Sequence, residues 1–491
     1  MKFQIFKNGK VVEDCGLCGA YMFGTDGVSI RRTSITFKNG IIECKKPNLE
    51  TAGLALLWHV EGFGRVLLPT TCLPERKQPY ILNVEIARAK LMQITNKRED
   101  WSFFDAVEGM EEISKQAQDL FIRAIQKIQD PAAASQLADE SLEKALVFSE
   151  KLAVRQGQLL FNLKSKNHGF GRGWLGCRLD PAQIGNPKYM DRLFDAFGFV
   201  TIPINWASIE PRPGSYDFSS VDACVSVLAK KKVVVGAGPV LRFCKDCLPE
   251  WLLDDQMGFE KIRETAFQFV LKVVGRYAGN VHRWCSVGGL NELNHFNFNF
   301  EQTVEMTRAA SMAVKAINAR AINLIEVSSP WGEYYGTTPN SIPPLVYMDM
   351  VIQSGVNLDA FGLQMCFGKD ESGMHVRDMM QISALLDLFS PMAKTIYITD
   401  VEIPSRSGSG LYDGKVAGVW HQKWDQGRQS RWIEQFYRIA ISKPFVDAVT
   451  YANLGDREDS TIVQSGLLNE QFEPKESFLA IKGLRNAALR R

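Results

Sequence analysis

The chain has no long hydrophobic run and no strong net charge of either sign. The first absence argues against a membrane-spanning helix, and the second argues against a strongly charged partner. No apolar run reaches the ~18 residues that a membrane-spanning helix needs. The net charge is only +2, from 57 Lys and Arg against 55 Asp and Glu. This balance argues against nucleic acid or an anionic membrane as the main partner. Low-complexity tracts and internal repeats are also absent. The length of 491 residues and the ordinary balance of hydrophobic and charged residues predict a globular protein of two or three domains.

Cofactor motifs and a signal peptide are missing as well. The sequence contains no P-loop, dinucleotide fingerprint, Ser-His-Asp spacing or HExxH motif, so we expect no cofactor. The first ten residues alternate apolar and polar side chains and lack the apolar core of a signal peptide. As written, the chain is expected to stay in the cytoplasm, although export by another route is not excluded. The sequence does not indicate an oligomeric state.

Ten cysteines in 491 residues are unlike the dense pattern of a small secreted disulfide scaffold. Two pairs have CxxC spacing, Cys15 with Cys18 and Cys244 with Cys247. This spacing would suit half of the ligands of a tetrahedral zinc site, but no third ligand stands at ligand spacing near either pair. We therefore interpret both pairs as reduced thiols in loops and expect no metal.

The second half of the chain alternates short apolar runs with segments of helical spacing, such as 259–277 and 301–318. Alternation of this kind is typical of a parallel sheet, and eight repeats in about three hundred residues match a closed (β/α)₈ barrel. Catalytic residues of that fold lie at the C-terminal ends of the strands. The eight runs are Leu175–Leu179, Phe199–Pro203, Lys232–Gly236, Val281–Val287, Ile322–Val327, Ala360–Gln364, Thr395–Val401 and Ala448–Tyr451.

Three regions are expected along the chain. Residues 1–100 read as a β-rich N-terminal domain, with Asn39-Gly40 as a hairpin turn and a helix at about 79–96. Residues 101–168 read as an antiparallel helical linker pair, broken at Asp130-Pro131 because the residue before proline leaves helical geometry. The barrel occupies 169–491, and the glycine-rich segment 168–173 is the expected boundary.

Several barrel segments resemble family-10 glycoside hydrolases, whose best-known members are endo-β-1,4-xylanases. The longest match is 197–218, where Trp206, Ser208-Ile209-Glu210-Pro211 and Tyr216-Asp217-Phe218 fit the family's W-x-S-I-E-P-x-x-G-x-Y-D-F stretch. Shorter matches follow in the family's order and span about three hundred residues. They are Pro249–Leu252, Arg276–Gly279 with Trp284, Phe361–Gln364, Thr395–Glu402, and Pro474-Lys475 with Phe478.

The resemblance implies hydrolysis of β-1,4-linked glycans by two carboxyl groups, one acting as general acid/base and one as nucleophile. The family carries its acid/base in an Asn-Glu pair after the fourth strand, and Asn291-Glu292 is the pair near that strand here. It lies three residues later than the family spacing from Trp284. Glu292 reaches the site if Gly288-Gly289-Leu290 forms a bulge, and otherwise it is a solvated loop acid.

At the seventh strand Asp400 occupies the nucleophile position and Glu402 follows two residues later. Strand periodicity places both side chains on one face. Asp is one methylene shorter than Glu, and a reacting atom misplaced by ~1 Å costs ~100-fold in rate. The alternatives are that Asp400 acts on a shifted backbone, that Glu402 has taken the role, or that Asp400 is a structural carboxylate held by an arginine such as Arg406.

Several positions that bind the sugar in the family carry other residues here. The Glu-Asn pair and the Lys of the second strand read Thr201, Ile202 and Asn205, and the Trp of the eighth strand reads Ala452. Gln364 is retained. We expect these changes to weaken an ordinary xylan reaction, because catalysis rests on contacts formed at the transition state. The expected substrate contacts are Asn205, Trp206, Asn291, Trp331, Glu333 and Gln364.

The leading hypothesis is therefore a retaining hydrolase of β-linked, xylan-like polysaccharide or oligosaccharide. The alternative is a weak or inactive barrel that binds carbohydrate, and a third hypothesis is a structural module whose barrel face docks a protein. Two loop segments are also candidates for lining the site. The run 290–300 forms either a polar rim or the cap of the next helix, and 420–425 carries aromatic residues at the pocket mouth.

Overall fold

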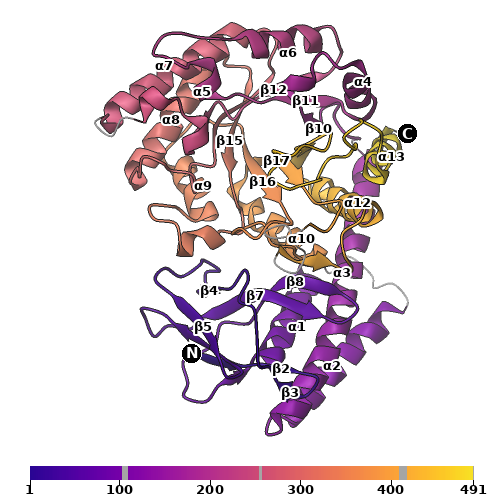
Figure 1. Ribbon diagram of the computed structural model, residues 1–491. Helices are drawn as coiled ribbons and strands as arrows, with labels where there is room; N and C mark the ends of the chain where they lie inside the picture. Colours follow the sequence, from indigo (N-terminus) through magenta and orange to yellow (C-terminus); the bar gives the residue numbers. More distant parts are fainter. Residues whose placement is uncertain (102–108, 168, 254–256, 409–416, 490–491) are drawn as a thin grey trace.

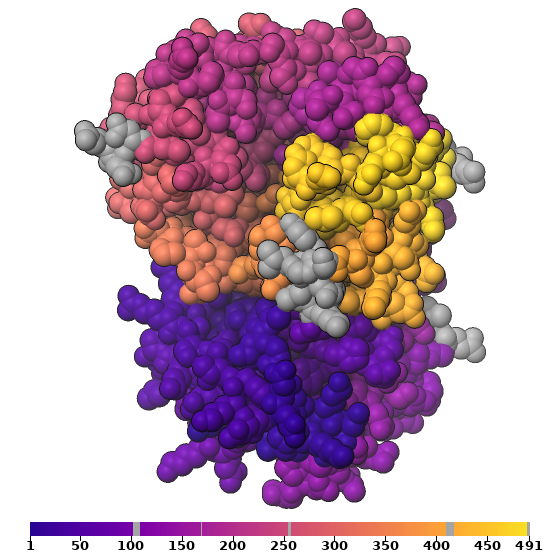
Figure 2. Space-filling view, viewed as in Figure 1, coloured from indigo at the N-terminus to yellow at the C-terminus, as the bar shows by residue number. Residues whose placement is uncertain are grey.

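The computed structural model describes residues 1–101, 109–167, 169–253, 257–408 and 417–489. Within these ranges, no helix combines the length and the apolar character that crossing a membrane requires. Figures 1 and 2 show two parts in contact, an N-terminal region of residues 1–167 and a barrel formed by the rest of the described chain.

In the described part of the chain, eight parallel strands close into a barrel. The sheet runs β12-β11-β10-β19-β17-β16-β15-β14, and pairing of β12 with β14 closes it, with the short β13 (Leu241–Arg242) extending the pairing along β14. Each of the predicted runs is a strand, with ends that differ by a few residues. The strands are β10 (Leu175–Arg178), β11 (Phe199–Ile202), β12 (Val234–Ala237), β14 (Arg283–Gly288), β15 (Ile322–Val327), β16 (Ala360–Cys366), β17 (Thr395–Glu402) and β19 (Val446–Tyr451).

Helices follow the strands and cover the outside of the barrel, as Figure 1 shows. Most begin at a proline or at a side-chain cap, such as Asn186 before α4 and Asp425 before α12, because both remedy the unbonded N–H groups of a first turn. The helices are α4 (Pro187–Ala196), α5 (Trp206–Ile209), α6 (Ser219–Ala229), α7 (Phe259–Tyr277), α8 (Phe300–Ile317), α9 (Pro344–Gln353), α10 (Met379–Leu388), α12 (Gln426–Ser442) and α13 (Glu476–Leu489).

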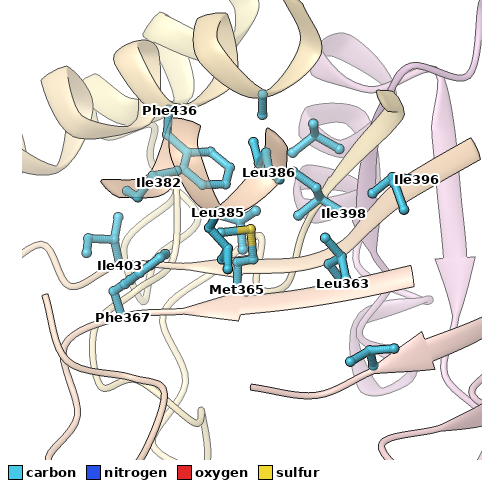
Figure 3. Packing of buried hydrophobic residues seen from close by; sticks show 14 of the residues in the cluster. Leu363, Met365, Phe367, Ile382, Leu385, Leu386, Ile396, Ile398, Ile403 and Phe436 are labelled. Atoms are coloured by element: carbon cyan, nitrogen blue, oxygen red, sulfur yellow. The ribbon is translucent and has the colours of Figure 1, made fainter. Parts of the chain in front are cut away.

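Alternate residues of the strands bury apolar side chains under these helices. Figure 3 shows Leu363 and Met365 of β16 and Ile398 of β17 packed against Leu385 of α10 and Phe436 of α12. Burial of each such side chain stabilises the fold by about 1.5–3 kcal/mol. Because side chains alternate along a strand, the intervening residues face the barrel interior.

The N-terminal region contains two four-stranded sheets and a two-stranded sheet formed by β2 and β3. One four-stranded sheet has the order β5-β6-β1-β9, and the other has the order β18-β8-β7-β4, in which β18 comes from the barrel. The predicted turn is confirmed, since Lys38 pairs with Ile41 across Asn39 and Gly40, both at positive φ, as a type I′ hairpin requires. The strands are β1 (Lys2–Gln4), β2 (Phe6–Lys7), β3 (Lys10–Val11), β4 (Tyr21–Phe23), β5 (Ser34–Lys38), β6 (Ile41–Lys45), β7 (Gly53–Val60), β8 (Gly64–Pro69) and β9 (Tyr80–Ile81).

Three helices follow these strands: α1 (Leu82–Asp100), α2 (Met110–Gln126) and α3 (Pro131–Asn167). The sequence predicted a linker pair, but α1 packs against both α2 and α3, so the helices form a group of three. The predicted break at Pro131 is present, because α3 begins there. Residues 102–108 and 168, which belong to the predicted pair and boundary, lie outside the described residues. Figure 1 shows α3 running from the N-terminal region along the barrel, where it packs on α10 and α12.

The N-terminal region is bound to the loops that follow β15, β16 and β17. The strand β18 (Val419–Trp420), in the loop after β17, pairs antiparallel with β8. Trp420 Nε1 donates to Glu150 of α3 at 2.6 Å, and the next residue, His421, contacts the same carboxylate at 2.6 Å. Lys90 of α1 forms a buried ion pair with Asp378, at 2.9 Å, beside the start of α10. Trp420 and His421, the first residues of the segment 420–425, thus contribute to this junction, and the expectation that the segment covers the pocket mouth stays a prediction.

Candidate active site

A bulge in β17 turns Asp400 and Glu402 toward the barrel interior. Ile398 pairs with Leu363, but Gln364 pairs with Asp400, so Thr399 is the extra residue. The extra residue reverses the alternation of sides, because an inserted residue shifts every later side chain to the other face. Without it, Asp400 would share the outer face with Ile398. The expectation that Asp400 and Glu402 share a face agrees with their pairing to Gln364 and Cys366.

Asp400 is held by an arginine from the first strand of the barrel. Arg178 Nε donates to Asp400 Oδ1 at 3.0 Å, and a second guanidinium nitrogen donates to Oδ2. Gln364 Nε2 lies 3.4 Å from Oδ2. Burial raises the pKa of Asp400, and the Arg178 guanidinium opposes that rise. The sequence suggested Arg406 for this partner, and the structure corrects it to Arg178.

A second ion pair lies inside the barrel beside the first. Arg242 of β13 donates to Glu326 of β15, whose side chain is almost fully buried. Arg242 also interacts electrostatically with Arg178 and Asp400. Sequence analysis missed Arg178, Arg242 and Glu326, although a charged residue inside an apolar strand is a usable signal, since charges are seldom buried unpaired.

Glu402 has amide partners rather than a cation in direct contact. Its carboxylate accepts hydrogen bonds from Asn453 Nδ2 and from the backbone N–H of Ile462, the latter at 2.8 Å. Burial, with the nearby charge of Asp400, raises its pKa to about 8. The side chain therefore favours the protonated form at neutral pH, unlike the ionised form that a nucleophile needs.

Glu292 lies in a turn immediately after β14. Gly289 adopts φ +69° and its carbonyl accepts the N–H of Glu292 at 3.0 Å and of Leu293 at 2.7 Å. The sequence predicted a bulge at Gly288-Gly289-Leu290. The register shift in β14 lies earlier, between Cys285 and Val287. A Cβ atom at position 289 would lie only 2.5 Å from Ser328 Oγ, so the turn has no room for a side chain there.

Glu292 is partly exposed as a residue, but its carboxyl group is buried and accepts a hydrogen bond from Ser329. Burial is the main cause that raises its pKa to about 7, and Glu371 adds to the rise while Arg242 opposes it. Arg242 thus interacts with both Glu292 and Asp400. A carboxyl group that titrates near pH 7 is suited to donating and accepting a proton at neutral pH.

Asn291, the neighbour of Glu292, is fully buried, and both its Nδ2 and its Oδ1 form hydrogen bonds. Its Nδ2 donates to the carbonyl of Ser328 at 3.0 Å and to the Tyr334 hydroxyl, and its Oδ1 accepts from the Ser328 N–H at 3.2 Å. These bonds tie the turn that carries Glu292 to the end of β15. A role for Asn291 in holding Glu292 follows directly, and its predicted sugar contact stays a prediction.

Two predicted contacts lie after β11. Trp206 is 2% exposed and stacks on Phe269 of α7 with ring centres 4.6 Å apart. Its Nε1 donates to Glu210 at 2.8 Å. Asn205 is exposed, and its Oδ1 caps α5 by accepting the Ser208 N–H at 3.0 Å. A sugar contact by Trp206 would require the ring to leave this packing, whereas Asn205 retains a side-chain amide available to a ligand.

Trp331 and Glu333, in the loop after β15, meet residues of the loop after β16. Glu333 is buried, pairs with Arg377, and accepts the N–H of Gly373 at 2.6 Å. The Arg377 guanidinium lies 3.8 Å from the centre of the Trp331 ring. This packing joins the two loops that meet the N-terminal region, and the predicted sugar contacts of Trp331 and Glu333 stay predictions. The cap proposed for 290–300 is present, since Asn299 and Gln302 form a capping box on α8.

Two cavities open where the strands end. One, of about 240 Å³, is lined by Arg178, Ala452 and Asn453 among others. The other, of about 430 Å³, is lined by Arg406 and by Ile462, the residue whose N–H reaches Glu402. A water-sized cavity of about 20 Å³ lies deeper, beside Arg178 and Glu326. The volumes of the two cavities at the strand ends, about 240 and 430 Å³, lie near the lower end of the ~300–1,000 Å³ typical of ligand pockets.

A larger groove, whose lining does not include Glu292, Asp400 or Glu402, lies between the N-terminal region and the loops after β14 and β15. Its volume is about 950 Å³, and Asp26, Arg31, Phe300 and Tyr335 are among its lining residues. The Arg31 guanidinium stacks on the Tyr335 ring, 4.1 Å from its centre. Across the described ranges, no three His, Cys, Asp or Glu side chains are grouped so as to hold a metal ion.

Comparison with solved structures places the fold among the xylanase barrels. Xylanase 10B from Thermotoga maritima matches 69% of this chain and 99% of its own, with 17% identity and a TM-score of 0.51. Xylanase 10B from Thermotoga petrophila, solved with xylobiose, matches 67% and 98%, with 19% identity and a TM-score of 0.51. Xylanase B from Clostridium stercorarium matches 65% and 98%, with 14% identity and a TM-score of 0.50.

No protein-family model matches the chain, and no curated protein matches it. At these low identities the structural likeness establishes the fold alone. The barrel therefore has the architecture of the family-10 glycoside hydrolases that the sequence motifs resemble, and its activity has to be argued from its own side chains.

Proposed function

We propose that the barrel hydrolyses β-linked glycans of the xylan type, with Glu292 as the acid/base and Asp400 as the nucleophile. The observation that carries this proposal is the environment of Glu292. It stands after β14 without a cation in direct contact, and burial brings its pKa to about 7. A general acid at neutral pH needs such a value, because the group must carry a proton and also release it.

In the first step the Glu292 carboxyl donates its proton to the glycosidic oxygen as the bond from that oxygen to the anomeric carbon breaks. The Asp400 carboxylate attacks the same carbon from the opposite side and forms a glycosyl ester. In the second step the Glu292 carboxylate takes a proton from water, whose oxygen attacks the anomeric carbon and releases Asp400. Two successive displacements retain the configuration, and they require the two carboxyl groups to lie ~5–5.5 Å apart. A wider separation that admits a water would instead favour a single displacement by that water, with inversion.

Arg178 and Gln364 are positioning residues in this proposal. A guanidinium that binds both oxygens of a carboxylate favours the ionised form, which a nucleophile requires, and fixes its plane. The same contact lowers reactivity, because the charge that must attack is shared with Arg178. Together with the residues that replace the family's sugar contacts, Asn205 and Ala452, this predicts slow hydrolysis.

The test is a panel of chromogenic aryl-glycosides and polysaccharides, assayed with wild type and Glu292→Gln. Glutamine keeps the shape of the side chain but cannot act as an acid, so we expect a loss of about 10²–10⁴-fold. Glu301→Gln, an exposed carboxylate in the first turn of α8, is the matched control and should retain wild-type activity. Equal activity in wild type and Glu292→Gln would make Glu292 a bystander.

A second candidate is a barrel that binds carbohydrate without cleaving it. The specific observation in its favour is that Asp400 is 3% exposed and engaged by Arg178 through both oxygens. Calorimetric titration with xylo-oligosaccharides distinguishes the two proposals. Binding by wild type, with no product on any substrate after prolonged incubation, would favour the binding barrel.

A further inference from the structure

The segment after β13 brings two cysteines together at the mouth of the barrel. Cys244, Lys245, Asp246 and Cys247 form a single turn of 3₁₀-helix, η2 (Lys245–Cys247), in which the N–H of Cys247 donates to the carbonyl of Cys244 at 3.0 Å. A turn closed in this way keeps its first and fourth Cα atoms within ~7 Å, and a disulfide needs ~4.4–6.8 Å. The two thiols also share a hydrogen bond.

Both thiols can be reached from solvent, since Cys244 and Cys247 are half-buried and the two residues between them are exposed. The preceding residue, Phe243, forms a bridge with Asn294, and the N–H of His295 donates to its carbonyl at 2.9 Å. The cysteine turn is therefore anchored at the mouth, beside the loop that carries Glu292. Thiol chemistry at this turn does not depend on glycan hydrolysis by the barrel.

We propose that Cys244 and Cys247 form a redox-active dithiol that exchanges with small disulfides. The Cys244 thiolate attacks one sulfur of a disulfide oxidant, forms a mixed disulfide and releases one thiolate. Cys247 then gives up its proton and attacks the sulfur of Cys244, which releases the second thiolate. The dithiol loses two electrons and two protons, and the oxidant becomes two thiols.

The order of attack follows from the surroundings of the two sulfurs. The hydrogen bond from Cys247, with the nearby Arg242 charge, lowers the pKa of Cys244 to about 7, while the same bond raises the pKa of Cys247. A thiol whose pKa lies near the ambient pH is the better attacking group, because it combines a large thiolate fraction with good nucleophilicity.

Cys15 and Cys18 have the same spacing and serve as an internal control. The turn there closes between Leu17 and Ala20 at 3.0 Å, and the Cys15 thiol donates to the carbonyl of Gly16 at 3.7 Å. Burial raises the pKa of Cys15. If the turn and the shared hydrogen bond cause the reactivity, this pair should lag behind Cys244 and Cys247.

The experiment equilibrates the full-length protein in a series of oxidised and reduced glutathione mixtures, alkylates the free thiols, and digests with trypsin. Trypsin cuts after Lys245, so the disulfide joins two peptides, 243–245 and 246–261, whereas both cysteines of the control lie in the single peptide 11–31. We expect the joined pair to form at a roughly tenfold lower ratio of oxidised to reduced glutathione than a disulfide within 11–31. Dithiothreitol should reverse it.

Cys247→Ser should trap glutathione on Cys244, and Cys244→Ser should leave Cys247 largely unmodified. Alkylated 243–245 and 246–261 that stay separate across the whole series would overturn the proposal. Oxidation of Cys15–Cys18 at the same ratio would overturn it too, because the spacing alone would then account for the reactivity.

Discussion

Buried carboxylates at the junction with the N-terminal region differ from those at the barrel mouth. At the junction, Asp378 pairs with Lys90 and Glu333 pairs with Arg377. At the mouth, Glu292 and Glu402 accept hydrogen bonds from neutral groups, and burial raises the pKa of both. A paired carboxylate stays charged and holds structure, whereas an unpaired one can bind and release a proton near neutral pH.

Asp400 stands between these two groups. It lies at the mouth, yet it is paired with a cation like the carboxylates of the junction. Asp400 can act as a nucleophile only if its contact with Arg178 loosens when a substrate binds. Variants of the junction and of the mouth test the difference between the two groups of carboxylates.

Removal of residues 1–165 should have the largest effect, because it strips the barrel of its partner at the loops after β16 and β17. The pairing edge of β18 and the faces of α10 and α12 that pack on α3 would be exposed. We expect little soluble protein, and aggregation by size-exclusion chromatography of what remains. A monomeric barrel with the melting temperature of the full chain would contradict this prediction.

Lys90→Met should destabilise the protein by about 3–5 kcal/mol, because Asp378 then remains buried without its counter-charge. Asp378 also caps α10, accepting the N–H of Met380 at 3.0 Å and of Gln381 at 3.1 Å. The matched control is Lys90→Met with Asp378→Asn, which removes both charges and keeps an oxygen for the cap. Chemical denaturation should recover most of the loss in the double variant, and an equal loss in both would refute the buried-charge explanation.

Glu402→Gln should stabilise the protein in a pH-dependent way. The folded state binds the Glu402 proton more tightly than the unfolded chain, because its pKa is raised from 4.5 to about 8. The wild type thus loses stability as the pH rises from about 4.5 to about 8, while the amide does not. Denaturation measured across this range should show the stability of Glu402→Gln relative to wild type rising by roughly 4 kcal/mol from pH 4.5 to pH 8. A difference that is constant with pH would argue against the raised pKa.

Asn299→Ala, outside both regions, should cost only about 1 kcal/mol, the usual value of a helix cap. Asn299 Oδ1 accepts the backbone N–H of Gln302 at 2.9 Å, and Gln302 Oε1 accepts the backbone N–H of Asn299 at 3.0 Å. Asn299→Asp keeps the acceptor and should be close to wild type in denaturant midpoint. If Asn299→Ala lowered the free energy of unfolding as much as Lys90→Met does, the local cap would matter as much as the buried ion pair, which would contradict this prediction.

Local patterns in the sequence were sufficient for much of the fold. Short apolar runs located the barrel strands, and Asn39-Gly40 and Pro131 marked a hairpin and a helix start, because these features depend on neighbouring residues alone. Motif order along 170–491 also indicated the barrel, which the xylanase structures support at the level of fold. The same local logic offered a helix cap as one of two alternatives for 290–300, and Asn299 does cap α8.

Only the tertiary structure decided how the carboxylates are partnered. Asp400 and Arg178 are 222 residues apart in the chain, and the bulge at Thr399, which turns Asp400 inward, leaves no mark in the alternation of apolar residues. Likewise, the contacts of Trp420 and His421 with Glu150 and the pairing of Glu333 with Arg377 join segments that are far apart in the chain. A side chain's periodicity fixes its face, but its charge state and its partners depend on what other strands and loops bring beside it.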